Sequence, residues 1–168
     1  MIDNMVDDKD NHVVESRVKE RPWELPLLLV GAFRSFLDDA HALLAEWGHP
    51  HVRPVYGFAL QAVGDGATAT EVGQRLGVSK QAAGKTLDLL SQAGYVTIAA
   101  DPDDKRRKLV RRTARGDDLL DKSVTAFAAV AGTWADRVGA ERVDQLTEVL
   151  AALGVATSAR IDLGSWMT

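Results

Sequence analysis

The stretch from Thr68 to Gly116 most constrains the fold, because its helix starts and stops are unusually clear. It reads TATEVGQRLGVSKQAAGKTLDLLSQAGYVTIAADPDDKRRKLVRRTARG. Thr68 and Glu71 have the spacing of a capping box, in which each side chain binds the other residue's backbone amide. Gly77 suits the left-handed conformation that ends a helix, and Ser79 is a favoured N-cap for the next one. The pattern predicts a helix-turn-helix.

A hairpin follows the second of these helices. The runs 95–98 and 108–111 are short β-prone segments, and they lie on either side of the polar segment DPDDKRR. In the helix before them, Ala83, Leu87 and Leu90 recur at helical spacing and form the expected buried face. The helix-turn-helix therefore continues into a β-ribbon with a basic tip.

The same region carries the positive charge of the chain. Residues 74–115 hold ten Lys and Arg against four acidic residues, a net charge of +6, whereas the whole chain has −4. The remainder therefore sums to −10. Because salt screens each charge beyond roughly 10 Å, the local concentration of charge matters more than the total. We expect this region to face a polyanion.

Double-stranded DNA is the polyanion that suits this arrangement. The first residues of the second helix in a helix-turn-helix enter the major groove, where Gln pairs with adenine and Lys with guanine. Arginine at the tip of a ribbon reaches a narrow minor groove, and Asp104 has the position to hold Arg106 by an ion pair. The predicted DNA-binding residues are Thr68, Thr70, Ser79, Lys80, Gln81, Ala82, Lys85, Lys105, Arg106 and Arg107.

Apart from an N-terminal arm, the rest of the chain is predicted to be helical. We expect a flexible arm over residues 1–22, a dimerisation helix over 23–50, the DNA-binding lobe over 52–115 and dimerisation helices over 116–168. Apolar residues with alternating spacings of four and three form a seam in the last part, at Leu120, Val124, Phe127, Ala131 and Trp134. Such seams pair with other helices of the chain or with a second subunit.

Composition excludes several classes of protein. The chain has no cysteine, which rules out disulfides and thiolate metal sites. No apolar run is long enough to cross a membrane, and the acidic N-terminus lacks the layout of a signal peptide, so we expect a cytoplasmic protein. No nucleophile–base pair or nucleotide-binding loop indicates an enzyme, and we expect no cofactor. His41, His49 and His51 lack a further ligand at metal-binding spacing, so the His49-Pro-His51 segment is expected to be a surface loop.

Residues 68–116 resemble the winged helix-turn-helix of the MarR family (multiple-antibiotic-resistance regulators). The runs TATEVGQRLGVSKQAAGKTLDLLSQAGYV and DPDDKRRKLVRRTARG stand in that family's order and spacing, and the flanking helices extend the resemblance to about residues 24–155. It implies a mainly α fold with a small β-hairpin and a homodimer built from N- and C-terminal helices. Asp104, Lys105 and Arg106 match the family's wing motif, although lysine at 105 lacks the planar fork of the usual arginine.

The resemblance also implies a repressor that binds a pseudo-palindromic operator and is released by a small lipophilic or phenolic ligand. Residues that we expect to line a ligand cleft are Phe33, Phe36, His41, Trp47, Arg53, Tyr56, Phe58 and Trp134. Core packing is the alternative role for these aromatic side chains. Two other functions remain open for the chain, namely a winged-helix module that heterodimerises with a regulator without reading DNA, and a small-molecule carrier.

Overall fold

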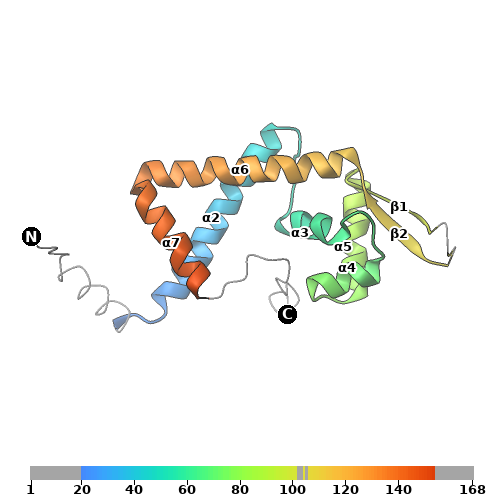
Figure 1. Ribbon diagram of the computed structural model, residues 1–168, viewed down its shortest axis with the longest axis horizontal. Coiled ribbons are helices and arrows are strands. Elements are labelled where there is room, and N and C mark those ends of the chain that lie inside the picture. The colour runs from blue at the N-terminus through green and yellow to red at the C-terminus, as the bar shows by residue number, and fades with distance from the viewer. Residues whose placement is uncertain (1–19, 102–103, 105, 154–168) are drawn as a thin grey trace, which may run out of the picture. The chain divides into compact units, whose positions relative to one another are not determined.

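The computed structural model describes residues 20–101, 104 and 106–153. In chain order these form α2 (Glu24–Glu46), α3 (Pro54–Val63), α4 (Ala69–Leu76), α5 (Lys80–Gln92), β1 (Val96–Ala100), β2 (Lys108–Arg112), α6 (Ala114–Val138) and α7 (Ala140–Ala152) (Figure 1). The expected fold class, mainly α with one β-hairpin, is confirmed. Most of the predicted N-terminal arm lies outside the described residues.

The chain divides into two compact units, residues 1–38 and 39–168. The described part of the first unit is the beginning of α2 and the turn before it. Large apolar side chains on this stretch are exposed to solvent. They are Trp23, Leu25, Leu27, Leu28, Leu29, Val30 and Phe33.

Local capping determines where α4 begins and ends, as the sequence predicts. The hydroxyl oxygen of Thr68 accepts from the amide of Glu71 at 3.3 Å, and the carboxylate of Glu71 accepts from the amide of Thr68 at 2.7 Å. Gly77 follows the helix with φ of 67°, in the left-handed region. The capping box and the glycine stop are both confirmed.

The second helix of the motif, α5, starts on a similar cap. The hydroxyl oxygen of Ser79 accepts from the amide of Ala82 at 3.1 Å. Ala83, Leu87 and Leu90 are buried, as predicted from their spacing. Residues of α5 pack against α3, α4 and β1, so one face of the helix belongs to the core. The opposite face is exposed to solvent.

The hairpin pairs β1 and β2 in antiparallel register, with Ile98 opposite Val110 and Ala100 opposite Lys108. Both strands extend beyond the predicted runs, to Ala100 and Arg112. Ala67 adds an isolated bridge to Val110, which joins the start of the helix-turn-helix to the second strand. The core beneath contains fully buried side chains from several elements, namely Leu60, Val63, Leu87, Leu90, Val96, Val110 and Leu119.

In α6 the buried face differs from the predicted seam. The buried large residues are Leu119 and Val130, with Ala126 between them, whereas Val124 of the predicted seam is 71% exposed and Phe127 is also exposed. At 3.6 residues per turn, the two stripes lie about a quarter of a turn apart. One apolar stripe of α6 therefore faces its own lobe, while the predicted seam is exposed at Val124 and Phe127 and half-buried at Leu120, Ala131 and Trp134.

Helix α7 packs on α6 but has no buried residue. Leu146 and Val149 are exposed on it, and Leu153 is exposed just after it. Among the described residues, no helix has both the length and the apolar character that a membrane crossing requires.

Candidate nucleic-acid interface

The predicted major-groove residues lie on the outer side of α5. Lys80, Gln81 and Lys85 are exposed, and Asp88 shares their face one turn further along the helix. Ala82 is half-buried behind them. This face offers two ammonium groups, one amide and one carboxylate, which suits hydrogen bonding to base edges.

The three predicted hydroxyl residues differ in what they contact. Thr68 and Ser79 are occupied as helix N-caps, through their bonds to Glu71 and Ala82. Thr70 is exposed in the first turn of α4. The backbone amides of a helix's first turn point outward and attract anions, so Thr70 marks a position suited to a phosphate.

The tip of the hairpin is a compact turn organised by Asp104. Its carboxylate oxygen Oδ1 accepts from the backbone amide of Arg106 at 3.0 Å, and its carbonyl accepts from the amide of Arg107 at 2.9 Å. The sequence predicts an ion pair with the side chain of Arg106, but the contact observed is with the backbone. Asp104 thus shapes the turn from which Arg106 projects into solvent. The predicted residue Lys105 lies outside the described residues.

Arg107 is tied to the helix-turn-helix. Its Nη2 atom lies 3.4 Å from Oε1 of Glu71, while the other carboxylate oxygen of Glu71 accepts from Thr68. The amide of Thr68 is the main cause of the lowered pKa of Glu71, with its hydroxyl, Arg107 and Arg75 adding to the effect. One carboxylate therefore joins the start of α4 to the wing.

Three other arginines of the basic region stabilise the lobe. Arg75 donates to the carbonyl of Ala62 at the end of α3, and Arg112 pairs with Asp117 at 2.6 Å. Arg115 donates to the carbonyl of Gly48, and its guanidinium carbon lies 5.0 Å from the centre of the Tyr95 ring. The net charge of the region thus overstates the number of cations that face outward.

Two exposed cations were missing from the predicted interface. Lys108 and Arg111 lie on β2, on opposite faces of the hairpin because side chains alternate along a strand. Both belong to the basic stretch, so the signal was present. The sequence could not distinguish them from Arg112, which lies at the end of the same strand and pairs with Asp117 of α6.

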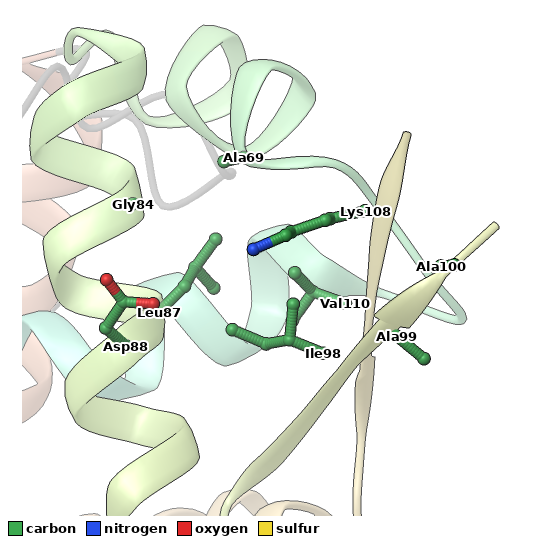
Figure 2. A pocket seen from close by; sticks show the side chains of 9 residues that line it. All are labelled: Ala69, Gly84, Leu87, Asp88, Ile98, Ala99, Ala100, Lys108 and Val110. Carbon is green, nitrogen blue, oxygen red and sulfur yellow. The ribbon is translucent and has the colours of Figure 1, made fainter. Parts of the chain in front are cut away.

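A hollow of about 500 Å³ separates α5 from the hairpin (Figure 2). Its walls are mainly apolar, and Lys108 and Asp88 are the charged residues that line it. Figure 2 shows Lys108 extending from β2 toward α5. The complete lining is Ala69, Gly84, Leu87, Asp88, Ile98, Ala99, Ala100, Lys108 and Val110. This volume is within the usual range of small-molecule sites.

The residues predicted to line a ligand cleft fall in both units and differ in exposure. Phe33 and Phe36 belong to the first unit, and the other six belong to the second. Tyr56 is buried in the core with its ring 6.3 Å from that of Tyr95, and Arg53 is exposed. The remaining four, His41, Trp47, Phe58 and Trp134, are half-buried. None of the eight lines the hollow beside α5, so the cleft they would form stays a prediction.

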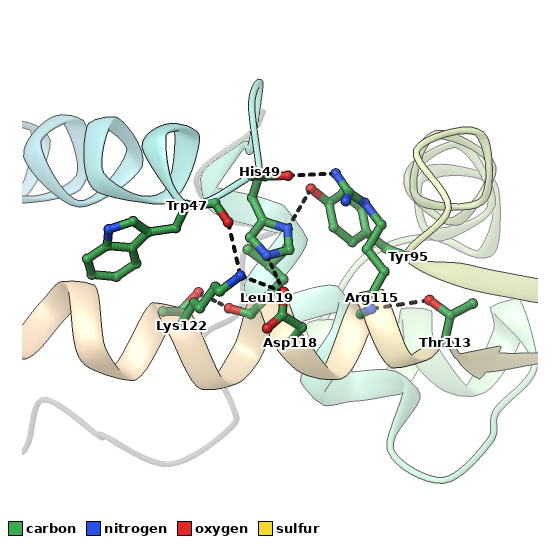
Figure 3. A network of polar contacts seen from close by, with 11 residues as sticks. Trp47, His49, Tyr95, Thr113, Arg115, Asp118, Leu119 and Lys122 are labelled. Carbon is green, nitrogen blue, oxygen red and sulfur yellow. Dashed lines mark hydrogen bonds and ion pairs between the residues drawn. The ribbon is translucent and has the colours of Figure 1, made fainter.

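The expectation of a surface His-Pro-His loop is wrong for His49. Its side chain is 1% exposed, whereas His51 is exposed with φ of 63°. His49 lies in a polar network with Tyr95 and Asp118 (Figure 3). Within the described part of the chain, no three His or acidic side chains form a group that could hold a metal ion.

A family model and solved structures match this chain. The model of the MarR family matches residues 58–107, which confirms the resemblance read from the helix-turn-helix and wing. No curated protein matches the sequence significantly.

Solved structures share the fold at low sequence identity. YusO from Bacillus subtilis is 18% identical with a TM-score of 0.62, over 83% of this chain and 98% of that one. A mutant of MarR from E. coli, complexed with operator DNA, is 19% identical with a TM-score of 0.60, over 82% and 96%. CouR from Rhodococcus jostii RHA1, bound to p-coumaroyl-CoA, is 21% identical with a TM-score of 0.54, over 82% and 96%.

Proposed function

We propose that this protein, whose residues 58–107 match the model of the MarR family, is a homodimeric transcriptional regulator that binds operator DNA and represses transcription. The observation that carries the proposal is the placement of exposed cations on both the recognition helix and the wing. Lys80 and Lys85 stand on α5, and Arg106 projects from the hairpin tip. The similar MarR mutant from E. coli was crystallised with operator DNA.

In this proposal α5 reads the major groove. Gln81 contacts an adenine edge, and Lys80 or Lys85 donates to guanine. Thr70 and the first-turn amides of α4 bind a phosphate, and Arg106 enters the adjacent minor groove. Lys108 and Arg111 add phosphate contacts on either side of the hairpin.

Dimerisation is supported by large apolar side chains that are exposed in the described part of the chain. Val124 and Phe127 are exposed on α6, and Leu146 and Val149 are exposed on α7. Large exposed apolar patches mark protein interfaces. Two copies joined through these helices would present two recognition helices to a pseudo-palindromic operator.

Release by a small molecule is the second part of the proposal. The hollow between α5 and the wing has apolar walls and an ammonium group from Lys108, a combination suited to an aromatic carboxylate. A ligand seated there would contact both DNA-binding elements, so it would alter their relative placement and lower operator affinity. The similar CouR from Rhodococcus jostii RHA1 was crystallised with p-coumaroyl-CoA.

Fluorescence anisotropy with the DNA upstream of the protein's own gene tests the proposal. We expect specific binding that falls steeply with salt, because each neutralised phosphate releases counterions. Arg106→Ala should weaken binding by at least about tenfold, as expected for loss of a charge-assisted contact. The exposed Arg137→Ala on α6, away from the interface, is the matched control.

Equal affinity for upstream DNA and random DNA would contradict the proposal and favour a heterodimerising module instead. Light scattering of the purified chain tests the dimer, and a monomer at micromolar concentration would contradict that part. A promoter–reporter fusion tests the sign of regulation, since deletion of a repressor raises expression.

A further inference from the structure

Apart from the tyrosines Tyr56 and Tyr95, His49 is the only buried polar or charged side chain in the described ranges 20–101, 104 and 106–153. It follows the end of α2, and its amide donates to the carbonyl of Leu44 at 2.8 Å. A buried imidazole is costly unless both ring nitrogens find partners. The partners of His49 therefore show what it contributes to the fold.

Both ring nitrogens are satisfied by distant parts of the chain (Figure 3). Nε2 lies 2.8 Å from Oδ2 of Asp118 on α6, and Nδ1 lies 3.2 Å from the hydroxyl of Tyr95 just before β1. An ionised carboxylate only accepts, so Nε2 carries the hydrogen toward Asp118. In the neutral ring, Nδ1 then accepts from the hydroxyl of Tyr95.

Two cations of α6 bind the carbonyls that precede His49. Lys122 donates to the carbonyl of Trp47 at 2.9 Å and pairs with Asp118 at 2.8 Å. Arg115 donates to the carbonyl of Gly48 at 2.9 Å and lies over the ring of Tyr95. Carbonyls at a helix end lack partners inside the helix, and cations there are favourable.

Contacts are present at both connections between the DNA-binding lobe and the rest of the second unit. The lobe, α3 to β2, joins the rest of the second unit through residues 47–53 before it and Thr113 after it. The first connection is bound to α6 as described. At the second, the amide of Thr113 donates to the carbonyl of Tyr95 at 3.0 Å, and its hydroxyl donates to the carbonyl of Gly94 at 2.7 Å. Rotation of the lobe about α6 would break contacts at both connections.

We propose that His49, through Tyr95 and Asp118, fixes the angle of the DNA-binding lobe on α6 and so determines which half-site spacing the dimer accepts. This inference rests on the proposed function, a homodimer on a two-part operator. Successive base pairs rise 3.4 Å, and the two half-sites of such operators lie about 34 Å apart. A lobe held at one angle matches one spacing, whereas a lobe free to rotate accepts neighbouring spacings as well.

Two conservative variants remove the contact from either side. Tyr95→Phe deletes only the hydroxyl and keeps the ring beneath Arg115, and His49→Gln keeps a donor toward Asp118 without the ring. Ser123→Ala is the control, because it removes a hydroxyl on the same helix whose partner, the carbonyl of Leu119, lies within α6. Thermal unfolding followed by circular dichroism establishes that each variant is folded at the assay temperature.

The readout is spacing preference. Selection from random DNA with the wild-type protein defines the half-site, and duplexes with the central spacer changed by one or two base pairs are then compared. We expect the wild-type ratio of affinities, optimal over shifted spacing, to fall about fivefold in Y95F and H49Q, the equivalent of one neutral hydrogen bond. S123A should keep the wild-type ratio.

The outcomes separate this inference from the proposed function. If the wild-type protein selects no DNA sequence, the proposed function fails and the inference fails with it. If the wild-type protein binds and both folded variants keep the wild-type ratio, the inference alone is overturned. A uniform loss of affinity at every spacing also overturns it, because that result indicates only a structural role.

Discussion

Gly73 and Val78 are in backbone contact across the turn of the helix-turn-helix. The amide of Val78 donates to the carbonyl of Gly73 at 2.9 Å, and the carbonyl oxygen of Val78 lies 2.9 Å from the place that a Cβ at residue 73 would occupy. Real Cβ atoms essentially never approach a neighbour so closely. Glycine at 73 therefore weakens α4 as a helix but allows the turn to close.

Alanine at residue 73 should destabilise the lobe, because the turn backbone must shift to admit a methyl group. We expect Gly73→Ala to lower the free energy of unfolding by about 1–3 kcal/mol, the usual cost of overpacking. Urea unfolding followed by circular dichroism measures the change.

The matched variant is Gly84→Ala on α5. No atom lies within 4 Å of the place its Cβ would occupy, and alanine in a helix interior is favoured over glycine by about 0.5–1 kcal/mol. G84A should therefore raise stability while G73A lowers it. Effects of the same sign would contradict this account of the two glycines.

Acid should weaken the bonds made by Glu71. The amide of Thr68, its hydroxyl and then Arg107 hold the pKa of this carboxyl below its usual 4.5. A lowered folded pKa contributes stability that is present above pH 4.5 and is lost as the pH falls through the folded value. The stability difference between wild type and Glu71→Gln should thus be constant at neutral pH and shrink below pH 4.5.

Chemical denaturation between pH 3 and pH 7 measures this difference, with the exposed Glu148→Gln of α7 as the control. A difference between wild type and E71Q that grows on acidification would show that the carboxylate is not stabilised in the folded state.

Asp118 offers a second test of acid dependence in the His49 network. The hydrogen bond that Asp118 accepts from Lys122 is the main cause of a pKa below the usual 3.8, and the hydrogen bond from His49 is the next. Its contribution is likewise present above pH 3.8 and lost as the pH falls through the folded pKa. Nuclear magnetic resonance titration of the carboxyl carbon should give a midpoint below 3.8, and Lys122→Met should raise it. A midpoint unaffected by this substitution would contradict the assigned contact.

Replacing a cation that stabilises the lobe should have a different effect from replacing a cation that binds DNA. Arg112 pairs with Asp117 and donates to the carbonyl of Leu60, whereas Arg111 is exposed on β2. Arg111→Ala should reduce the slope of log affinity against log salt by about 1, the effect of one lost phosphate contact. Arg112→Ala should lower unfolding free energy by about 1 kcal/mol and leave that slope unchanged. Equal slopes in the two variants would refute this division.

An aromatic carboxylate should bind beside α5. Isothermal titration of benzoate into the protein tests the hollow, and Lys108→Met should weaken binding roughly tenfold, because it removes the charged partner and keeps the apolar stem. Arg111→Met, on the opposite face of the hairpin, is the matched control. Benzoate affinity reduced by R111M but not by K108M would place the ligand elsewhere.

Much of the fold could be read from the sequence because it depends on neighbours within one turn. Thr68 with Glu71, Ser79 with Ala82, and glycine after α4 are contacts over three or fewer residues, and each appears in the structure. The periodicity of α5 likewise identified its buried face. The DNA-binding residues proposed from the sequence are exposed or form helix caps in the described chain, apart from the half-buried Ala82.

Tertiary structure alone decided which charged and polar residues are used internally. Arg75, Arg112 and Arg115 contribute to the positive charge of residues 74–115, but each binds a carbonyl distant in sequence. No local pattern marks such partners, because they meet only after the helices have packed.

The sequence by itself therefore determined the order of elements, their caps and the basic region, since these follow from backbone propensity and local charge. It could not determine that His49 is buried between Tyr95 and Asp118, which lie 46 and 69 residues away. It could not show which stripe of α6 faces the lobe, because Leu119 and Val124 are equally apolar. Burial depends on which surfaces meet in three dimensions, and only packing of the whole lobe supplies that.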